Sequence, residues 1–262
     1  MISGRAKATI LAAVLVVAVA ALAALASAEV IQRDKVRVSF NGELSPSRLP
    51  RQGLAPVRVS VSAKIVAVDG TTLPQLRRME IAINRHGHFD PAGLPVCHIR
   101  DIQPTTTADA LAACRDSLVG EGRFSAQVQV TEQAPFPSRG KVYAFNGRYQ
   151  GTPAILAHVY GTQPAPTSYT VPFVIRPGHG DFGTVLEAAL PDVVGSSGYV
   201  TGLSLNLGRS FTYRGATRSY LSAGCPAPPG FPGAPFRFAR ASFGFIGGRT
   251  LTSTLTRNCQ VR

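Results

Sequence analysis

The 262-residue sequence contains no tryptophan and has only 14 acidic residues against 27 basic ones. Tryptophan is the ring best suited to stacking on sugars and to cation–π contacts, so its absence argues against carbohydrate binding by ring stacking. Acidic residues are also unevenly placed, and none follows Asp192. The chain therefore has an excess of positive charge that is strongest toward its C-terminus.

Motifs for covalent or cofactor chemistry are missing as well. The chain has no Gly-x-Ser-x-Gly nucleophile motif, and its Gly195-Ser-Ser-Gly198 segment has the wrong spacing for one. It has no phosphate-binding loop of the P-loop or dinucleotide type. The sequence thus identifies no catalytic residue and no cofactor. A glycosidase pair of carboxylates leaves no local spacing, so a hydrolase stays open as an alternative.

The first 28 residues predict an export signal. Arg5 and Lys7 precede an uncharged run over 8–25, and Ala26-Ser27-Ala28 offers the small-x-small pattern of a cleavage site. The mature chain would then begin at Glu29 and span 29–262. An uncleaved membrane anchor is the alternative, because 18 uncharged residues can just cross a bilayer. No second run of that length occurs, so no span is expected in the mature chain.

Four cysteines lie after this signal, and an even number in an oxidising compartment predicts two disulfides. Four cysteines allow three pairings. Closeness in sequence favours Cys97 with Cys114 and Cys225 with Cys259. These features predict a protein that is secreted or exposed at the cell envelope.

Short runs of alternating or β-branched residues recur through the mature chain and predict a mainly β fold. Many such strands favour an antiparallel β-sandwich or a barrel-like architecture in a single domain. Proline-rich residues near 162–167 mark the place where the chain could divide in two. Asn-Gly at Asn41 and at Asn146 is typical of tight hairpins. The expected strands cover 36–40, 57–68, 79–84, 123–130, 141–145, 155–160, 168–175, 183–190, 200–207, 218–221, 236–245 and 250–256.

One helix is predicted at about 107–119. Thr106 or Thr107 would cap it, and Asp109 lies in the first turn, where a carboxylate meets the positive end of the helix dipole. Gly120 is placed to follow its C-terminus. Leu111, Cys114 and Leu118 share a helical face, which turns Cys114 toward the body of the protein.

The most specific candidate site is the segment His86-Gly-His88-Phe-Asp90. Two histidines at i and i+2 of a strand point to the same side, and the Asp90 carboxylate could add an oxygen ligand. Such a set suits zinc, nickel or copper. The other interpretation is a polar turn ending at Pro91, in which exposed histidines are ordinary.

The basic C-terminal third ends in residues 193–262, which carry eight arginines and no acidic residue. Such a field concentrates polyanions, so acidic cell-wall polymer or another polyanion is the expected partner. The competing interpretation is a composition that only keeps the surface soluble. Phe211 and Tyr213 alternate with arginines and could stack on a ligand or belong to the core. The candidate polyanion-binding residues are Arg209, Arg214, Arg218, Arg237 and Arg240.

Four segments of the chain carry a resemblance to known sequences: Gly93-Leu-Pro-Val-Cys97, Thr105-Thr-Thr through Ala113-Cys114, Val119-Gly-Glu-Gly122 and Ala144-Phe-Asn-Gly147. Together they resemble a family of secreted proteins from high-GC bacteria that has no assigned activity. The resemblance spans about 76–262 and implies export, disulfides and a β-rich fold, without any catalytic residue.

Taken together, these patterns favour an exported, non-enzymatic β domain that binds an acidic polymer through its basic C-terminal third. The alternative is a secreted hydrolase whose site is assembled from scattered carboxylates or from the cluster at His86, His88 and Asp90. A concave pocket with converging acids or histidines would favour the enzyme, and a basic surface without such a cleft would favour binding.

Overall fold

A computed structural model describes residues 28–129, 134–162, 166–190 and 198–262. Strands dominate this part of the chain, as predicted. The expected export signal lies outside it except for Ala28. The strands are β1 (Glu29–Arg33), β2 (Val36–Ser45), β3 (Arg48–Leu49), β4 (Ala55–Pro56), β5 (Arg58–Ala67), β6 (Leu76–Asn84), β7 (Gly87–Phe89), β8 (Leu118–Val128), β9 (Phe136–Tyr149), β10 (Thr152–Gly161), β11 (Thr167–Pro177), β12 (Phe182–Ala189), β13 (Gly198–Leu207), β14 (Ser210–Tyr213), β15 (Ala216–Ser219), β16 (Leu221–Ala223), β17 (Gly233–Phe245) and β18 (Thr250–Val261).

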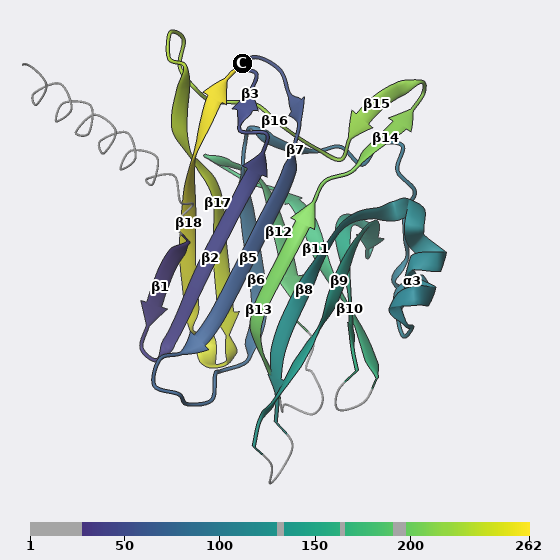
Figure 1. Ribbon diagram of the computed structural model, residues 1–262, viewed down its shortest axis with the longest axis vertical. Coiled ribbons are helices and arrows are strands. Elements are labelled where there is room, and N and C mark those ends of the chain that lie inside the picture. Colours follow the sequence, from purple (N-terminus) through teal and green to yellow (C-terminus); the bar gives the residue numbers. More distant parts are fainter. Residues whose placement is uncertain (1–27, 130–133, 163–165, 191–197) are drawn as a thin grey trace, which may run out of the picture.

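One large sheet holds 13 of the described strands in the order β1-β2-β5-β13-β8-β9-β10-β11-β12-β6-β17-β18-β3. All neighbours in it are antiparallel except β18 and β3. The sheet curls until β1 contacts β18, so that β2, β5, β13 and β8 form a near wall and β11, β12, β6 and β17 a far wall (Figure 1). The mainly β, antiparallel prediction is therefore confirmed.

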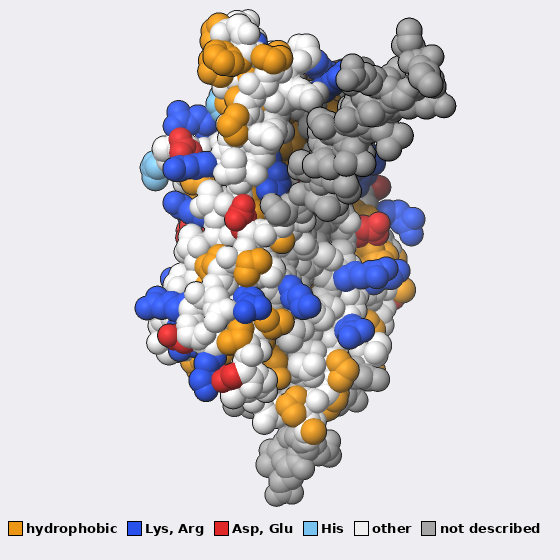
Figure 2. Space-filling view, turned by 60° about the vertical axis from the view of Figure 1, so that its left-hand side comes forward, with side chains coloured by type: hydrophobic (Ala, Val, Ile, Leu, Met, Phe, Trp, Pro, Cys, Tyr) orange, Lys and Arg blue, Asp and Glu red, His pale blue; other side chains and the backbone are white. Residues whose placement is uncertain are grey.

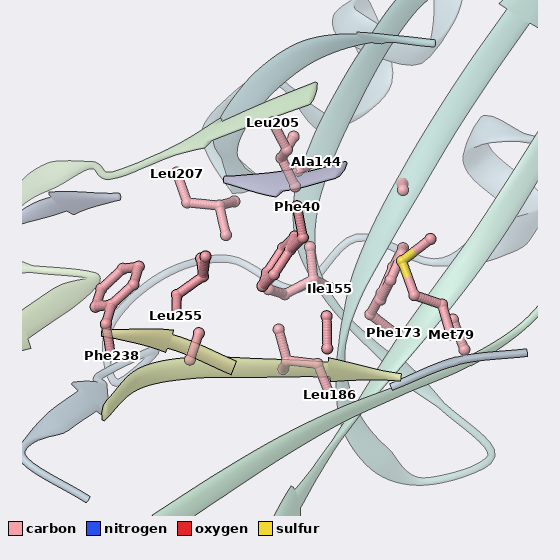
Figure 3. Close-up of a cluster of buried hydrophobic side chains, with 14 of the residues drawn as sticks. Phe40, Met79, Ala144, Ile155, Phe173, Leu186, Leu205, Leu207, Phe238 and Leu255 are labelled. Carbon is pink, nitrogen blue, oxygen red and sulfur yellow. The ribbon is translucent and has the colours of Figure 1, made fainter. Parts of the chain in front are cut away.

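The two walls bury one hydrophobic core between them. Residues of alternate positions point inward, as in Val36, Val38 and Phe40 of β2, which are all buried. In Figure 3, Phe40, Leu205 and Leu207 from the near wall face Leu186 of β12 and Leu255 of β18. Phe40 meets Phe243 of β17 edge to face, with 6.1 Å between ring centroids. In strands such as β2 this alternation buries one face and leaves the other face in solvent, whereas the central parts of β9 and β10 are buried on both faces.

The connection near 162–167 joins two neighbouring strands of that sheet. Residues 163–165 lie outside the described residues, but β10 and β11 pair directly, with Gly161 opposite Thr167. The proline-rich segment thus connects adjacent strands of the same sheet.

The predicted helix is present but shorter than expected. Helix α3 covers Thr107–Cys114, and a 3₁₀ turn over Arg115–Ser117 leads into β8 at Leu118. Thr106 caps α3, because its Oγ1 accepts a hydrogen bond from the backbone N–H of Asp109 at 3.2 Å. Gly120 lies inside β8 and does not end the helix. A single turn of helix, α2 (Ile99–Ile102), precedes α3.

The hairpin expectation at the two Asn-Gly pairs is wrong. Gly42 lies within β2 and Gly147 within β9, because close packing there requires a residue without a side chain. A Cβ atom on Gly147 would stand 2.5 Å from Leu156 Cδ1. A Cβ atom on Gly42 would stand 3.0 Å from carbon atoms of both Leu255 and Phe238.

Both predicted disulfides are confirmed. Cys97–Cys114 closes a loop with a sequence separation of 17, and Cys225–Cys259 closes one of 34. The first bond fastens α3 to the outer face of β9 and β10, where a second small core has formed around Phe145 and Leu156. The second ties the loop after β16 to β18.

Replacing both cysteines of one disulfide by serine should lower the free energy of unfolding measured in urea. Chain entropy predicts a loss of about 3 kcal/mol for Cys97→Ser with Cys114→Ser and about 4 kcal/mol for Cys225→Ser with Cys259→Ser. Amide exchange should speed up mainly in α3 in the first variant. Unchanged unfolding in either variant would show that its disulfide does not stabilise the fold.

Candidate functional site

His86, His88 and Asp90 lie on and beside the short strand β7, but they do not form a three-ligand group. The Asp90 carboxylate forms an ion pair with Arg218 at 2.9 Å and accepts a hydrogen bond from the backbone N–H of Ala92. No cluster of three or more histidine, cysteine or acidic side chains that could hold a metal occurs within the described ranges. The candidate metal site at these positions is therefore not assembled, because Asp90 is engaged elsewhere.

The two histidines instead stand at the edge of an apolar part of the interior. Both line a small cavity together with Phe89 and Leu221. Burial lowers the pKa of His86, and the positive charges of Arg85 and His88 lower it further. The described residues that line this cavity include no carboxylate.

The late arginines find carboxylates from earlier parts of the chain. Arg218, Arg237 and Arg249 pair with Asp90, Asp181 and Asp34 at 2.9, 3.1 and 3.2 Å respectively. Arg240 lies 3.9 Å from Glu80 and 4.8 Å from the ring centroid of Phe182. The charge imbalance along the sequence is thus partly neutralised by folding.

Two more of these arginines bind main-chain oxygens. Arg209 Nη1 donates to the carbonyls of Arg115 and Leu118 at 3.1 and 2.8 Å. Arg257 Nε donates to the carbonyl of Gly42 at 2.7 Å. These contacts join β18 and the residue just before β14 to distant segments, so the guanidinium groups act as structural links.

On the side of the molecule that carries β1 and β18, basic side chains are scattered, and several have acidic neighbours (Figure 2). Farther along the chain, Arg214 and Arg218 lie over the ring of Tyr213 on the β14–β15 hairpin, at 5.2 and 5.6 Å from its centroid. The ring itself packs against Gly93, where a Cβ atom would stand 2.3 Å from it. Phe211 packs against the main core. The five candidate polyanion-binding residues therefore divide among structural contacts on different elements.

A different set of cations gathers on the near wall. Lys64, Arg123, Arg139 and Lys141 come from β5, β8 and β9, and all four are exposed. They line a shallow groove of about 910 Å³, which we call the basic groove. Its outer surface runs over β5, β13, β8 and β9, the strands at the front of Figure 1.

Strand register explains how these side chains meet. One row across the sheet reads Lys64, Gly202, Ser125 and Arg139. The next row reads Ser62, Ser204, Arg123 and Lys141. Strands are about 4.8 Å apart, so Lys64 and Arg139 stand about 14 Å apart across a floor of glycine and serine.

The cations of this groove lack the acidic partners that Arg218, Arg237 and Arg249 have. Arg123 lies directly opposite Lys141, an arrangement in which like charges destabilise an antiparallel sheet. Within the described ranges, none of the four cations forms an ion pair with a carboxylate. Hydroxyls of Ser125 and Thr201 are hydrogen-bonded to each other at 3.0 Å in the floor. The groove therefore offers cations and hydroxyls together.

The basic groove is not predicted by the number of charged residues in successive parts of the sequence, because its cations come from separate strands. All four strands involved are expected from the sequence, at 57–68, 123–130, 141–145 and 200–207, and strand alternation places Arg123 and Lys141 on one face. One feature of the sequence that could have indicated a groove is the small size of neighbouring outward-facing residues, such as Ser62 and Ser204. Which strands lie side by side could not be read from that pattern.

The interior also contains two apolar cavities, of about 150 and 90 Å³. Phe173 and Leu203 line both of them. Cavity formation in a protein core costs about 24 cal/mol per Å³, so the larger one alone costs about 4 kcal/mol when empty. Native interiors rarely contain such voids, since side chains normally fill them.

His158 is a buried titratable group beneath α2. Its side chain on β10 is fully buried, and its Nδ1 donates to the carbonyl of Ile102 at 2.9 Å. Its Nε2 has no hydrogen-bond partner among the described residues. Burial lowers the pKa of His158, partly opposed by that hydrogen bond. The ring is thus neutral near pH 7 and supports the attachment of α2 to the sheet.

No family model, curated protein or solved structure matches the chain. The resemblance to secreted proteins of high-GC bacteria therefore stays a prediction.

No helix in the described ranges is long and apolar enough to cross a membrane. The two disulfides are compatible with a secreted protein.

The unfolding free energy should fall as the pH drops below about 6.5, the ordinary value for histidine. A lowered pKa in the folded state means that the unfolded chain binds more protons, so stability is fully present above that pH and is lost below it. His158→Leu should flatten the change measured by urea unfolding between pH 7.5 and 5. His179→Gln, a change in an exposed turn, should retain the wild-type slope, whereas a slope unaltered by His158→Leu would contradict this role.

Proposed function

We propose that this protein is an exported, non-enzymatic binding protein for an acidic carbohydrate polymer, which it holds in the basic groove. The observation that carries the proposal is the group of four exposed cations without an acidic partner in the described structure. An anionic polymer would relieve the repulsion between Arg123 and Lys141, because its charges would lie between theirs.

The shape of the groove supports a polymer over a small anion. Lys64 lies on the far side of the serine and glycine floor from Arg139 and Lys141, so anionic groups separated along a chain can each meet a cation. Serine hydroxyls of the floor can donate and accept hydrogen bonds, which suits a partner that carries hydroxyls as well as acids. This mode of binding uses charge and hydroxyl groups, and it does not need tryptophan.

The proposed polymer-binding site lies on different residues from the arginines expected from the sequence. The C-terminal arginines contribute positive charge to the whole molecule, which raises the encounter rate with any polyanion. Contacts that hold the polymer are instead expected from β5, β8 and β9. No arrangement of carboxylates or histidines described above favours the hydrolase.

Reversing two charges, Arg123→Glu with Lys141→Glu, should weaken binding of polygalacturonate at least tenfold in 0.15 M salt. Each exposed ion pair is worth about 0.2 to 1 kcal/mol, and reversal also adds repulsion. Isothermal titration calorimetry would measure the affinity, and wild-type binding should weaken steeply as salt is raised from 0.05 to 0.5 M, because salt screens exposed charges (Debye length of about 8 Å at 0.15 M).

The matched control is Arg33→Glu with Arg148→Glu, two exposed sites outside the groove with the same change in net charge. Its affinity should stay within about twofold of the wild type. Equal losses in both variants, or no binding at low salt, would overturn the proposal. Equally strong competition by duplex DNA would show that the groove does not select acidic carbohydrate. Circular dichroism checks that every variant is folded.

Export makes a separate prediction about the N-terminus. Protein recovered outside the cytoplasm should have a mass that corresponds to a chain beginning at Glu29, because Ala26-Ser27-Ala28 provides the cleavage pattern. An Ala28→Arg variant should accumulate as precursor, while Ser27→Ala should be processed normally. Recovery of the intact wild-type N-terminus in the membrane fraction would instead favour the anchor.

A further inference from the structure

The larger cavity lies where several strands of the curled sheet begin or end. Val128 is the last residue of β8, Thr167 the first of β11 and Gly198 the first of β13, and all three line the cavity. Leu190, just after β12, lines it too. The cavity is therefore at one end of the space between the walls, and the smaller cavity continues inward from it.

Phe173 and Leu203 stand between the two cavities and line both. Figure 3 shows Phe173 close to Met79, which also lines the larger cavity. The two spaces thus form an elongated apolar volume interrupted by a few side chains. A single ligand that occupies both cavities would have to displace the side chains of Phe173 and Leu203.

We infer that this interior binds a single unbranched alkyl chain, which enters at the strand ends and extends past Phe173 toward the smaller cavity. An apolar cavity of 150 Å³ stays dry and takes a molecule of about the size of benzene. With the smaller cavity added, the volume suits a chain of about eight to ten carbons. The elongated shape favours a linear chain over a compact ring.

The head group of such a molecule would stay near the strand ends. Gln127 lines both the larger cavity and the basic groove, and its Oε1 is buried without a hydrogen-bond partner in the described part of the chain. A hydroxyl at the end of the alkyl chain could donate to this oxygen. A carboxylate could instead interact with the cations of the groove, so decanol and decanoate distinguish the two kinds of head group.

The methyl group of Met79 provides a direct probe. The chain has two methionines, Met1 and Met79, and the Met79 side chain is buried at the cavity. In protein labelled with ¹³C at methionine methyls, saturating decanol or decanoate should shift the Met79 signal and give nuclear Overhauser contacts to the alkyl protons. No shift and no contact with either compound would overturn the inference.

Filling each cavity should change binding in a different way. Ala157→Phe places a ring in the larger cavity and should reduce the affinity for decanol at least tenfold. Ala239→Leu fills the smaller cavity and should shift the preferred length of the alkyl chain from ten carbons toward six. Ala216→Leu on the exposed β15 is the matched control and should bind as the wild type does.

If Ala157→Phe fails to fold, Ala157→Val makes the same test with a smaller loss of volume. Tight decanol binding in folded cavity-filled variants would contradict the interior site. Stronger binding of decanol than of decanoate would assign the head group to Gln127, and the reverse would assign it to the cations. The interior site and the proposed polymer site are tested independently, because polygalacturonate is not expected to shift the Met79 methyl signal.

Discussion

The register between β5, β13, β8 and β9 is the constraint on which both proposed sites depend. It aligns Lys64 with Arg139 across Gly202 and Ser125 on the outer face. On the inner face of the same strands, Leu203 and Phe124 stand opposite each other beside the larger cavity. A slip by one residue would exchange the two faces, so the cations would enter the core and the cavity lining would enter water.

The distribution of charge in the folded molecule differs from the distribution of charge along the sequence. The last 70 residues contain no acid, yet Asp34, Asp90 and Asp181 reach across from earlier strands to pair with arginines there. Exposed pairs of this kind contribute little stability individually. They matter more for the distribution of surface charge, because the four cations of the basic groove have no such acidic partners in the described part of the chain.

Small residues have two different uses in this sheet. In the groove they lower the floor between long cationic side chains, and at Gly42 and Gly147 they let side chains from another strand approach the backbone. The Asn-Gly pairs looked like turns because their local conformational preference is strong. Tertiary packing overrode that preference, and the asparagines use their side chains for other contacts: Asn146 Nδ2 donates to the carbonyl of Pro95 at 2.9 Å.

The sequence by itself determined the mainly β class, most strand positions, the start of α3 next to a cap at Thr106 or Thr107, and both disulfides. Each of these follows from local alternation, capping chemistry or closeness of cysteines along the chain. Only the tertiary structure decided that Asp90 forms an ion pair with Arg218 in place of a metal site with His86 and His88. It also decided that Lys64 lies in the same groove as Arg123, Arg139 and Lys141. Those groupings depend on which strands are neighbours and in which register, and pairings between residues far apart in the chain leave no periodic signal in the sequence.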